Sequence, residues 1–217
     1  MTDLLPHPFL FRFSIPVRRI AALPRPKPKL LELPDDCRLP DFGVFDAAPP
    51  FADVRVAWNE DGFGVSVRVD GKRHPPDCDP ERPDESDSLS VWIDTRNTQS
   101  IHRASRFCHG FRFFPAGGGR TGNEPAARQM LISQAREDAP QVPADRLHVA
   151  SQPDSTGYRL EAWLPAEALH GFDPETSPRL GFYYHVRDRE LGEQFLTVGP
   201  EFPFRHDPSL WSTLELS

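Results

Sequence analysis

The chain has 217 residues, of which 38% are hydrophobic, and its formal net charge at pH 7 is −7. That hydrophobic content is sufficient for a folded core, and the negative charge disfavours nucleic acid and anionic membranes as partners. The 25 prolines disfavour long helices, because proline removes a backbone donor and clashes with the preceding turn.

Apolar and polar residues alternate with a period of two from the N-terminus onward. This alternation predicts strands in FLFRFSI (9–15), DVRVAW (53–58) and FGVSVRV (63–69). The Asp-Gly pair between the last two strands predicts a hairpin turn. Ten of the prolines fall within residues 1–50, so we expect an N-terminal strand and an extended arm that packs on the rest of the chain.

The same alternation continues to the C-terminus. The further strands that it predicts are SLSVWID (88–94), RFCHGFRFF (106–114), RQMLISQ (128–134), GYRLEAWL (157–164), LGFYYHVRD (180–188), EQFLTVG (193–199) and LWSTLEL (210–216). One short helix is predicted at 165–171, which begins with Pro and ends with Gly. We therefore expect an all-β fold in one domain over residues 1–217. The expected architecture is an antiparallel β-sandwich of about nine or more strands, immunoglobulin-like or jelly-roll-like.

Two carboxylates enclose the strand DSLSVWID. Asp87 and Asp94 are seven residues apart, which on one strand corresponds to about 23 Å. An acid–base pair for glycoside chemistry needs a separation of about 5 to 10 Å. We therefore interpret both as the ends of a structural strand whose core stripe is Leu89, Val91 and Ile93.

Four segments occur in a characteristic order: DVRVAWNEDGFGVSVRV, DSLSVWID, GYRLEAWLPAEAL, and SPRLGFYYHVRDRE with the terminal WSTLEL. Together they resemble family 9 carbohydrate-binding modules and the wider group of DOMON-like sandwiches, over about residues 53–217. The resemblance implies a non-catalytic β-sandwich that binds a ligand, often a sugar, and in the wider group sometimes calcium or haem. The exposed aromatic pair with which sugar-binding members clamp their ligand is not placed by this sequence, so no binding residue is carried over.

Several aromatic side chains share the polar face of their strands with charged groups. Trp92 lies opposite the core stripe of its strand, Trp163 lies among Arg and Glu, and Tyr183 and His185 alternate with Arg187. Rings surrounded by hydrogen-bonding groups suit a sugar, so we predict that these residues contact the ligand. The alternative is that the proline-rich arm lies over this face and buries the rings.

An arginine-rich segment, 95–123, contains five Arg, two His and no acid. Because guanidinium groups bind carboxylate and phosphate, Arg106, Arg112 and Arg187 are predicted to meet a negative group on the ligand. The preceding loop, 77–87, carries six acids and one Arg. The alternative is that the two segments pair with each other or form ordinary solvated surface.

The acidic loop is also a candidate calcium site. Asp77, Asp79 and Glu81 alternate like the start of an EF-hand loop, but the sixth position lacks Gly and Ser88 stands where the bidentate Glu belongs. The cysteines and histidines lack the paired short spacing of structural zinc ligands. The sequence therefore predicts no cofactor, with calcium in this loop as the alternative.

We predict a non-catalytic module that binds a small molecule or glycan, either a carbohydrate or a related polar or acidic ligand. One alternative is a hydrolase or lyase whose site uses His102, His109 and Glu161, and another is a structural or oligomerisation module. Neither a signal peptide nor a membrane span is visible, so a cytoplasmic protein is expected. The sequence gives no indication of the oligomeric state.

Overall fold

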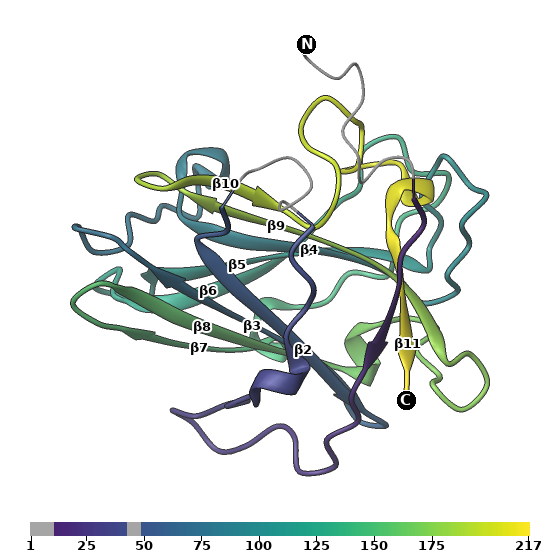
Figure 1. Ribbon diagram of the computed structural model, residues 1–217, viewed down its shortest axis with the longest axis horizontal. Helices are drawn as coiled ribbons and strands as arrows, with labels where there is room; N and C mark the ends of the chain where they lie inside the picture. The colour runs from purple at the N-terminus through teal and green to yellow at the C-terminus, as the bar shows by residue number, and fades with distance from the viewer. Residues whose placement is uncertain (1–10, 43–48) are drawn as a thin grey trace.

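The structure is a computed structural model that describes residues 11–42 and 49–217. In these residues two β-sheets pack face to face (Figure 1). The larger sheet contains β1 (Ser14–Val17), β11 (Ser212–Leu216), β9 (Arg179–Asp188), β4 (Ser88–Asp94), β5 (Cys108–Gly118) and β6 (Glu124–Met130) in that order, and β10 (Gly192–Phe195) pairs with β9. The smaller sheet has the order β2 (Ala52–Asn59), β3 (Gly62–Asp70), β8 (Gly157–Pro165) and β7 (His148–Pro153). The predicted β-sandwich is confirmed.

Neighbouring strands are antiparallel, with one exception. β1 runs parallel to β11, with Ser14 opposite Thr213. Both strands therefore begin at the same end of the sandwich. β11 pairs with the first half of β9 and β10 with the second half, so the chain between β10 and β11 runs along the outer side of the larger sheet.

The core lies between the two sheets. The period-two pattern directs the apolar side chains of each strand toward it. Leu89, Val91 and Ile93 of β4 are fully buried, as are Val65 and Val67 of β3. β4 spans Ser88–Asp94, which confirms that the two aspartates mark the ends of this strand.

The predicted helix is shorter in the structure. The expected helix at 165–171 is a single 3-10 turn, Ala166–Ala168. The turn begins after Pro165, and the chain reverses at Gly171, whose φ of +86° favours glycine. Similar turns in the described residues are Asp35–Cys37, Pro83–Glu85, Ala144–Arg146 and Pro208–Leu210. Over the described ranges, 11–42 and 49–217, no helix has the length and apolar character needed to cross a membrane.

Several strand predictions differ from the structure. The strand predicted at 128–134 is β6, at Glu124–Met130, and the one predicted at 193–199 is β10, which ends at Phe195. β7, at His148–Pro153, was not predicted, because Val149 and Ala150 are both buried and the alternation is lost. Val149 belongs to the core between the sheets, whereas Ala150 packs under the N-terminal arm. The first strand, predicted at 9–15, begins only at Ser14; residues 9 and 10 lie outside the described residues.

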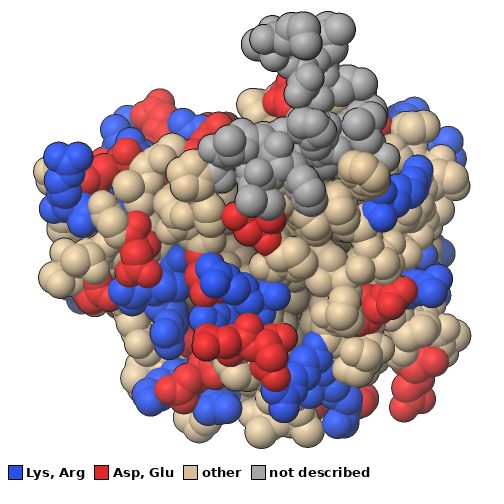
Figure 2. All heavy atoms as spheres, viewed as in Figure 1, with Lys and Arg blue, Asp and Glu red and all other residues tan. Residues whose placement is uncertain are grey.

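The proline-rich arm lies over the outer face of the smaller sheet. Leu30, Leu31 and Leu33 form a second apolar cluster with Trp163 of β8. The carboxylate of Glu161 accepts hydrogen bonds from the backbone amides of residues 31 and 32, at 3.1 and 2.8 Å. Acidic and basic side chains lie next to one another on this side of the molecule (Figure 2).

A buried ion-pair network ties the two sheets together at one end. Lys72 follows β3, Asp87 precedes β4, and Asp188 ends β9. The Lys72 Nζ lies 3.0 Å from Asp87 Oδ2 and 2.7 Å from Asp188 Oδ2, and both carboxylates are fully buried. Burial alone would lower the pKa of Lys72, but the hydrogen bonds that it donates to both aspartates outweigh burial and raise it.

Candidate functional site

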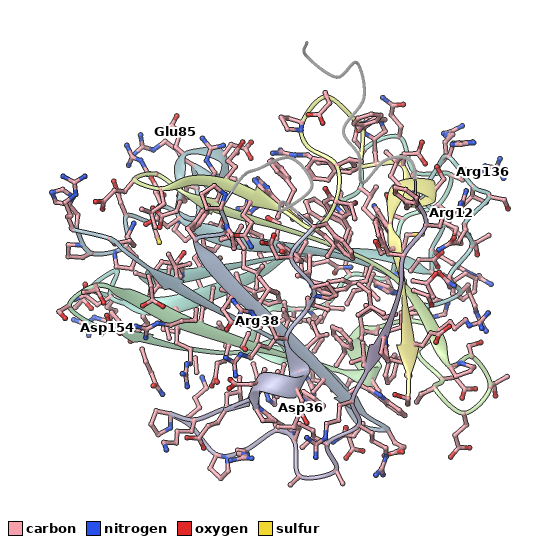
Figure 3. All side chains as sticks on the ribbon, in the orientation of Figure 1. Arg12, Asp36, Arg38, Glu85, Arg136 and Asp154 are labelled. Carbon is pink, nitrogen blue, oxygen red and sulfur yellow. The ribbon has the colours of Figure 1, made fainter. Side chains whose placement is uncertain are left out.

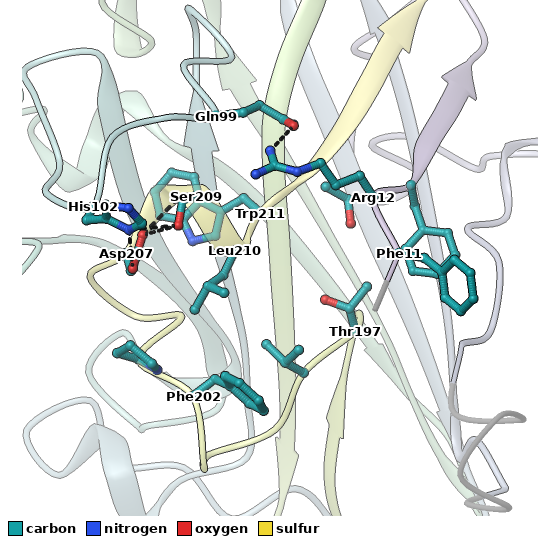
Figure 4. Close-up of a pocket in the computed structure, with 14 residues that line it drawn as sticks. Phe11, Arg12, Gln99, His102, Thr197, Phe202, Asp207, Ser209, Leu210 and Trp211 are labelled. Carbon is teal, nitrogen blue, oxygen red and sulfur yellow. Dashed lines mark hydrogen bonds and ion pairs between the residues drawn. The ribbon is translucent and has the colours of Figure 1, made fainter. Parts of the chain in front are cut away.

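A cavity of about 410 Å³ opens at the end of the sandwich where β1 and β11 begin (Figure 4). This volume falls in the range of small-ligand sites, roughly 300–1,000 Å³. Three segments far apart in the sequence form its walls, around residues 11–13, 99–102 and 197–212. The described lining residues are Phe11, Arg12, Phe13, Gln99, His102, Thr197, Val198, Phe202, Pro203, Asp207, Ser209, Leu210, Trp211 and Ser212.

The turn after β4 brings the second of these segments to the cavity. Asp94 accepts hydrogen bonds from the backbone amides of Arg96 and Thr98, at 2.9 and 2.6 Å. Asn97, between them, has a φ of +47°, a left-handed conformation that Asn tolerates better than most residues. The aspartate that ends the strand therefore shapes the turn that leads to Gln99.

Gln99 connects two walls of the cavity. Its Oε1 accepts a hydrogen bond of 2.7 Å from Nη1 of Arg12, and its Nε2 donates one of 2.6 Å to Oγ1 of Thr213 on β11. Thr213 in turn donates from its backbone amide to the carbonyl oxygen of Phe13, at 3.0 Å. These bonds hold the side chains of residues 12 and 99 in fixed relative positions.

Polar side chains at the far wall resemble a catalytic triad in composition but differ in geometry. The Ser209 hydroxyl lies 2.6 Å from Asp207 Oδ1, and His102 Nδ1 lies 3.1 Å from both Asp207 Oδ2 and Ser209 Oγ. In a triad, the serine and the aspartate contact opposite nitrogens of the imidazole, so that the ring can pass a proton between them. Here both contact the same nitrogen, an arrangement suited to holding the three side chains in place.

Asp207 and Ser209 belong to the segment between β10 and β11, which continues around the cavity and is supported by the larger sheet. Trp211 donates from its indole nitrogen to the carbonyl oxygen of Phe204, at 2.8 Å. The hydroxyl of Tyr183 donates to the carbonyl oxygen of Val198. The rings of Tyr183 and Phe204 stack at 4.7 Å, and Trp92 meets Phe204 edge-on at 5.5 Å.

Three of the predicted ligand contacts therefore lie one layer beneath the cavity wall. Trp92, Tyr183 and His185 are 3%, 0% and 2% exposed. Their outward face is covered by the chain at 195–204, where Phe195 stacks on His185 at 4.6 Å. Burial lowers the pKa of His185 to about 3, so the ring is neutral at pH 7. Direct contact of these side chains with a ligand stays a prediction, and it requires the covering segment to move.

Trp163 is covered by the proline-rich N-terminal arm, as the alternative interpretation of the sequence expected. Its ring is 2% exposed and packs against the leucines of the N-terminal arm. Among the three enzyme candidates, Glu161 lies beneath the same arm. His109 is buried on the inner face of β5, where Nε2 lies 3.2 Å from the carbonyl oxygen of His170, and burial lowers its pKa to about 4. His102 alone lies at the cavity, so the structure does not bring these three side chains together.

The three predicted arginines do not form one group. Arg112 and Arg187 share the outer face of the larger sheet, where they pair with Asp84 at 3.0 Å and Glu193 at 2.8 Å. Arg106 lies elsewhere, with its guanidinium carbon 5.2 Å from the centre of the Phe107 ring. The Arg112–Asp84 pair joins the arginine-rich segment to the acidic loop, as the alternative interpretation expected. Binding of a negative ligand by these arginines stays a prediction.

Most acids of loop 77–87 engage cations of the protein itself. Asp77 pairs with Arg189, and Asp79 pairs with Arg82 at 2.9 Å. Asp87 belongs to the buried network with Lys72. Within residues 11–42 and 49–217, no three His, Cys, Asp or Glu side chains are grouped so that they could hold a metal ion.

A second depression lies on the outer face of the smaller sheet. Its volume is about 50 Å³, far below that of typical ligand sites. Two of its arginines are engaged by acids, Arg55 by Asp53 at 2.8 Å and Arg68 by Asp154 at 2.6 Å. Asp154, which pairs with Arg68, and Arg12 of the larger cavity lie at opposite ends of the molecule (Figure 3).

Sequence reasoning missed most of the cavity. It placed the stretch at 193–199 on a strand and gave Gln99, Asp207, Ser209 and Trp211 no role. The available signal was the composition of residues 196–211, where apolar rings, prolines and hydrogen-bonding side chains occur without strand alternation. That composition is typical of a structured loop rather than a strand.

Two antiparallel sheets around a shared core, with a cavity at one end, define the chain as a β-sandwich module. Solved structures with this fold include a family 9 carbohydrate-binding module from Caldicellulosiruptor kristjanssonii. Its cellotriose complex has a TM-score of 0.60 and 14% identity, and the match covers 94% of each chain. Its glucose complex has a TM-score of 0.62 and 13% identity, covering 94% of this chain and 96% of the module.

A candidate carbohydrate-binding protein from Bacteroides uniformis also shares the fold. Its TM-score is 0.56 at 15% identity, and the match covers 95% of this chain and all of that protein. No protein-family model matches the sequence, and no curated protein matches it either. The similarity to family 9 modules suggested by the sequence motifs is therefore confirmed at the level of the fold.

Proposed function

We propose that this protein is a non-catalytic carbohydrate-binding module and that its sugar binds in the cavity at the start of β1 and β11. The observation that carries the proposal is the composition of the cavity wall. The aromatic residues Phe11, Phe202 and Trp211 line the cavity together with the hydrogen-bonding residues Gln99 and Ser209. Sugars present apolar C–H faces between hydroxyl groups, so a site for them needs both kinds of surface.

Preorganisation of the polar groups supports this assignment. Gln99 is fixed by Arg12 and Thr213, and Ser209 is fixed by Asp207. Groups already held in place lose little conformational entropy when they bind a ligand. The solved modules that share the fold are complexes with cellotriose and glucose, which makes these two sugars the first ligands to test.

Isothermal titration calorimetry with glucose and cellotriose tests the proposal. We expect binding by the unmodified protein and at least about fivefold weaker binding by Gln99→Ala, which is about 1 kcal/mol for a lost hydrogen bond. Gln152→Ala is the matched control, because its amide also donates a hydrogen bond within the protein, to the carbonyl oxygen of Pro28, but on the smaller sheet. Equal effects of the two substitutions, or no binding of either sugar at millimolar concentration, would contradict the proposal.

A further inference from the structure

Arg12 brings a positive charge to the cavity that no described acid neutralises. Its guanidinium donates to the neutral amide oxygen of Gln99 through Nη1, at 2.7 Å. No Asp or Glu within residues 11–42 and 49–217 forms an ion pair with it, whereas Arg18, Arg19 and Arg25, the next arginines along the chain, each pair with an acid. The donors on Nε and Nη2 have no hydrogen-bond partner in that part of the chain.

The carboxylate of the cavity does not pair with Arg12. Asp207 is the single acid among the described lining residues, and both of its oxygens are engaged. Oδ1 accepts from the backbone amide of Ser209 at 3.0 Å and from its hydroxyl at 2.6 Å, and Oδ2 lies 3.1 Å from His102 Nδ1. The oxygens of Asp207 are thus occupied by its own neighbours, and the donors that the described wall leaves available to an anionic ligand include those of Arg12.

We propose that the preferred ligand is a sugar that carries an anionic group and that Arg12 binds this group. This proposal rests on the proposed sugar site. A guanidinium offers parallel N–H donors that match the two oxygens of a carboxylate or phosphate. Gln99 engages one edge of the guanidinium and leaves the other donors available. A uronic acid and a sugar phosphate share this chemistry.

Calorimetry with glucose, glucuronate and glucose 6-phosphate separates the sugar site from its charge preference. Because Arg12 is exposed, the expected preference for an anionic sugar over glucose is moderate, about three- to tenfold. The preference should shrink as the NaCl concentration rises from about 0.05 to about 0.5 M, because the Debye length falls from about 14 to about 4 Å. The ratio of glucuronate to glucose 6-phosphate affinity identifies the anionic group.

Two variants test whether Arg12 carries the preference. Arg12→Gln should reduce the ratio of anionic-sugar to glucose affinity to about one, and Arg12→Lys should retain part of the preference. Because Arg12 also holds Gln99, the readout is this ratio and not the affinity for glucose alone. Arg120→Gln, an exposed arginine of the β5–β6 hairpin, is the matched control and should retain all of the preference. Equal affinity for glucose and both anionic sugars would overturn the charge preference but leave the sugar site standing. Equal weakening of all three ligands by Arg12→Gln would also overturn the charge preference alone. Binding of none of them would overturn both proposals.

Discussion

Replacement of Lys72 by Met removes the single cation of the buried network that joins the sheets. The ammonium lies 2.7–3.0 Å from two carboxylates, and its side chain is 3% exposed. Both aspartates keep hydrogen bonds from two backbone amides, but their charges would stay buried without a cation. Breaking such a pair costs about 3–5 kcal/mol, because the uncompensated charge cannot reach water. For a chain of this length, the melting temperature should fall by about 6 to 20 °C.

The chain supplies its own control for this prediction. Lys29 pairs with Glu32 at 2.7 Å, but the two side chains are 64% and 39% exposed. Lys29→Met should therefore cost less than about 1 kcal/mol. Thermal and urea unfolding, followed by circular dichroism, measure both variants. If Lys72→Met were no more destabilising than Lys29→Met, the network would not hold the sheets together as described.

The same network predicts a pH dependence at the alkaline end. The raised pKa of Lys72 means that the folded state holds its proton more tightly than the unfolded chain does. The resulting stability is fully present below about pH 10.4 and is lost as the pH rises through the raised value. The unmodified protein should therefore lose stability above this pH more steeply than Lys72→Met, as measured by urea unfolding at pH 9 to 11.5.

Three further predictions concern other parts of the fold. Tyr183→Phe removes the hydrogen bond to Val198, so sugar affinity should fall severalfold by calorimetry, with a loss in stability of about 1 kcal/mol; unchanged affinity would separate this ring from the cavity. Glu161→Gln weakens the two bonds that hold the arm, at a cost of about 1.5–3 kcal/mol, and limited proteolysis should then cut first within residues 20–37; protection equal to that of the unmodified protein would contradict this. Burial lowers the pKa of His185 to about 3, so the stability due to its neutral form is full above pH 6.5 and declines by about 1.4 kcal/mol per pH unit below it. His185→Gln should flatten the decline in urea-unfolding stability between pH 6 and 4, and an unchanged slope would contradict the assignment.

The strands of the sandwich were predictable because burial on one side dictates their pattern. Leu89, Val91 and Ile93 alternate with polar residues, so their strand and its core face could be read directly. β7 could not be predicted from the sequence pattern, because the N-terminal arm covers its outer face and Ala150 is buried as well as Val149. Where both faces of a strand are covered, the period-two signal disappears.

The sequence predicted which face of its strand each aromatic ring occupies, but not which segments of the chain bury these rings. Trp163 was placed correctly opposite the core, and the three leucines of LLELP could have indicated what buries it, because they need an apolar partner. Trp92 and Tyr183 are covered by the segment between β10 and β11, whose course depends on tertiary packing. The cavity joins segments about 90 residues apart or more, which no local pattern brings together. Localisation in the cytoplasm stays a prediction from the sequence.

The central claim is that a sugar binds in the cavity at the start of β1 and β11, and the indole N–H signals of the tryptophans test it most directly. Of the four tryptophans, Trp211 lines the cavity, whereas Trp163 is buried beneath the arm. In ¹⁵N–¹H spectra recorded during titration with cellotriose or glucuronate, we expect the Trp211 indole signal to shift with ligand concentration and that of Trp163 to stay in place. A saturable shift of the Trp163 signal with Trp211 unchanged would contradict the account.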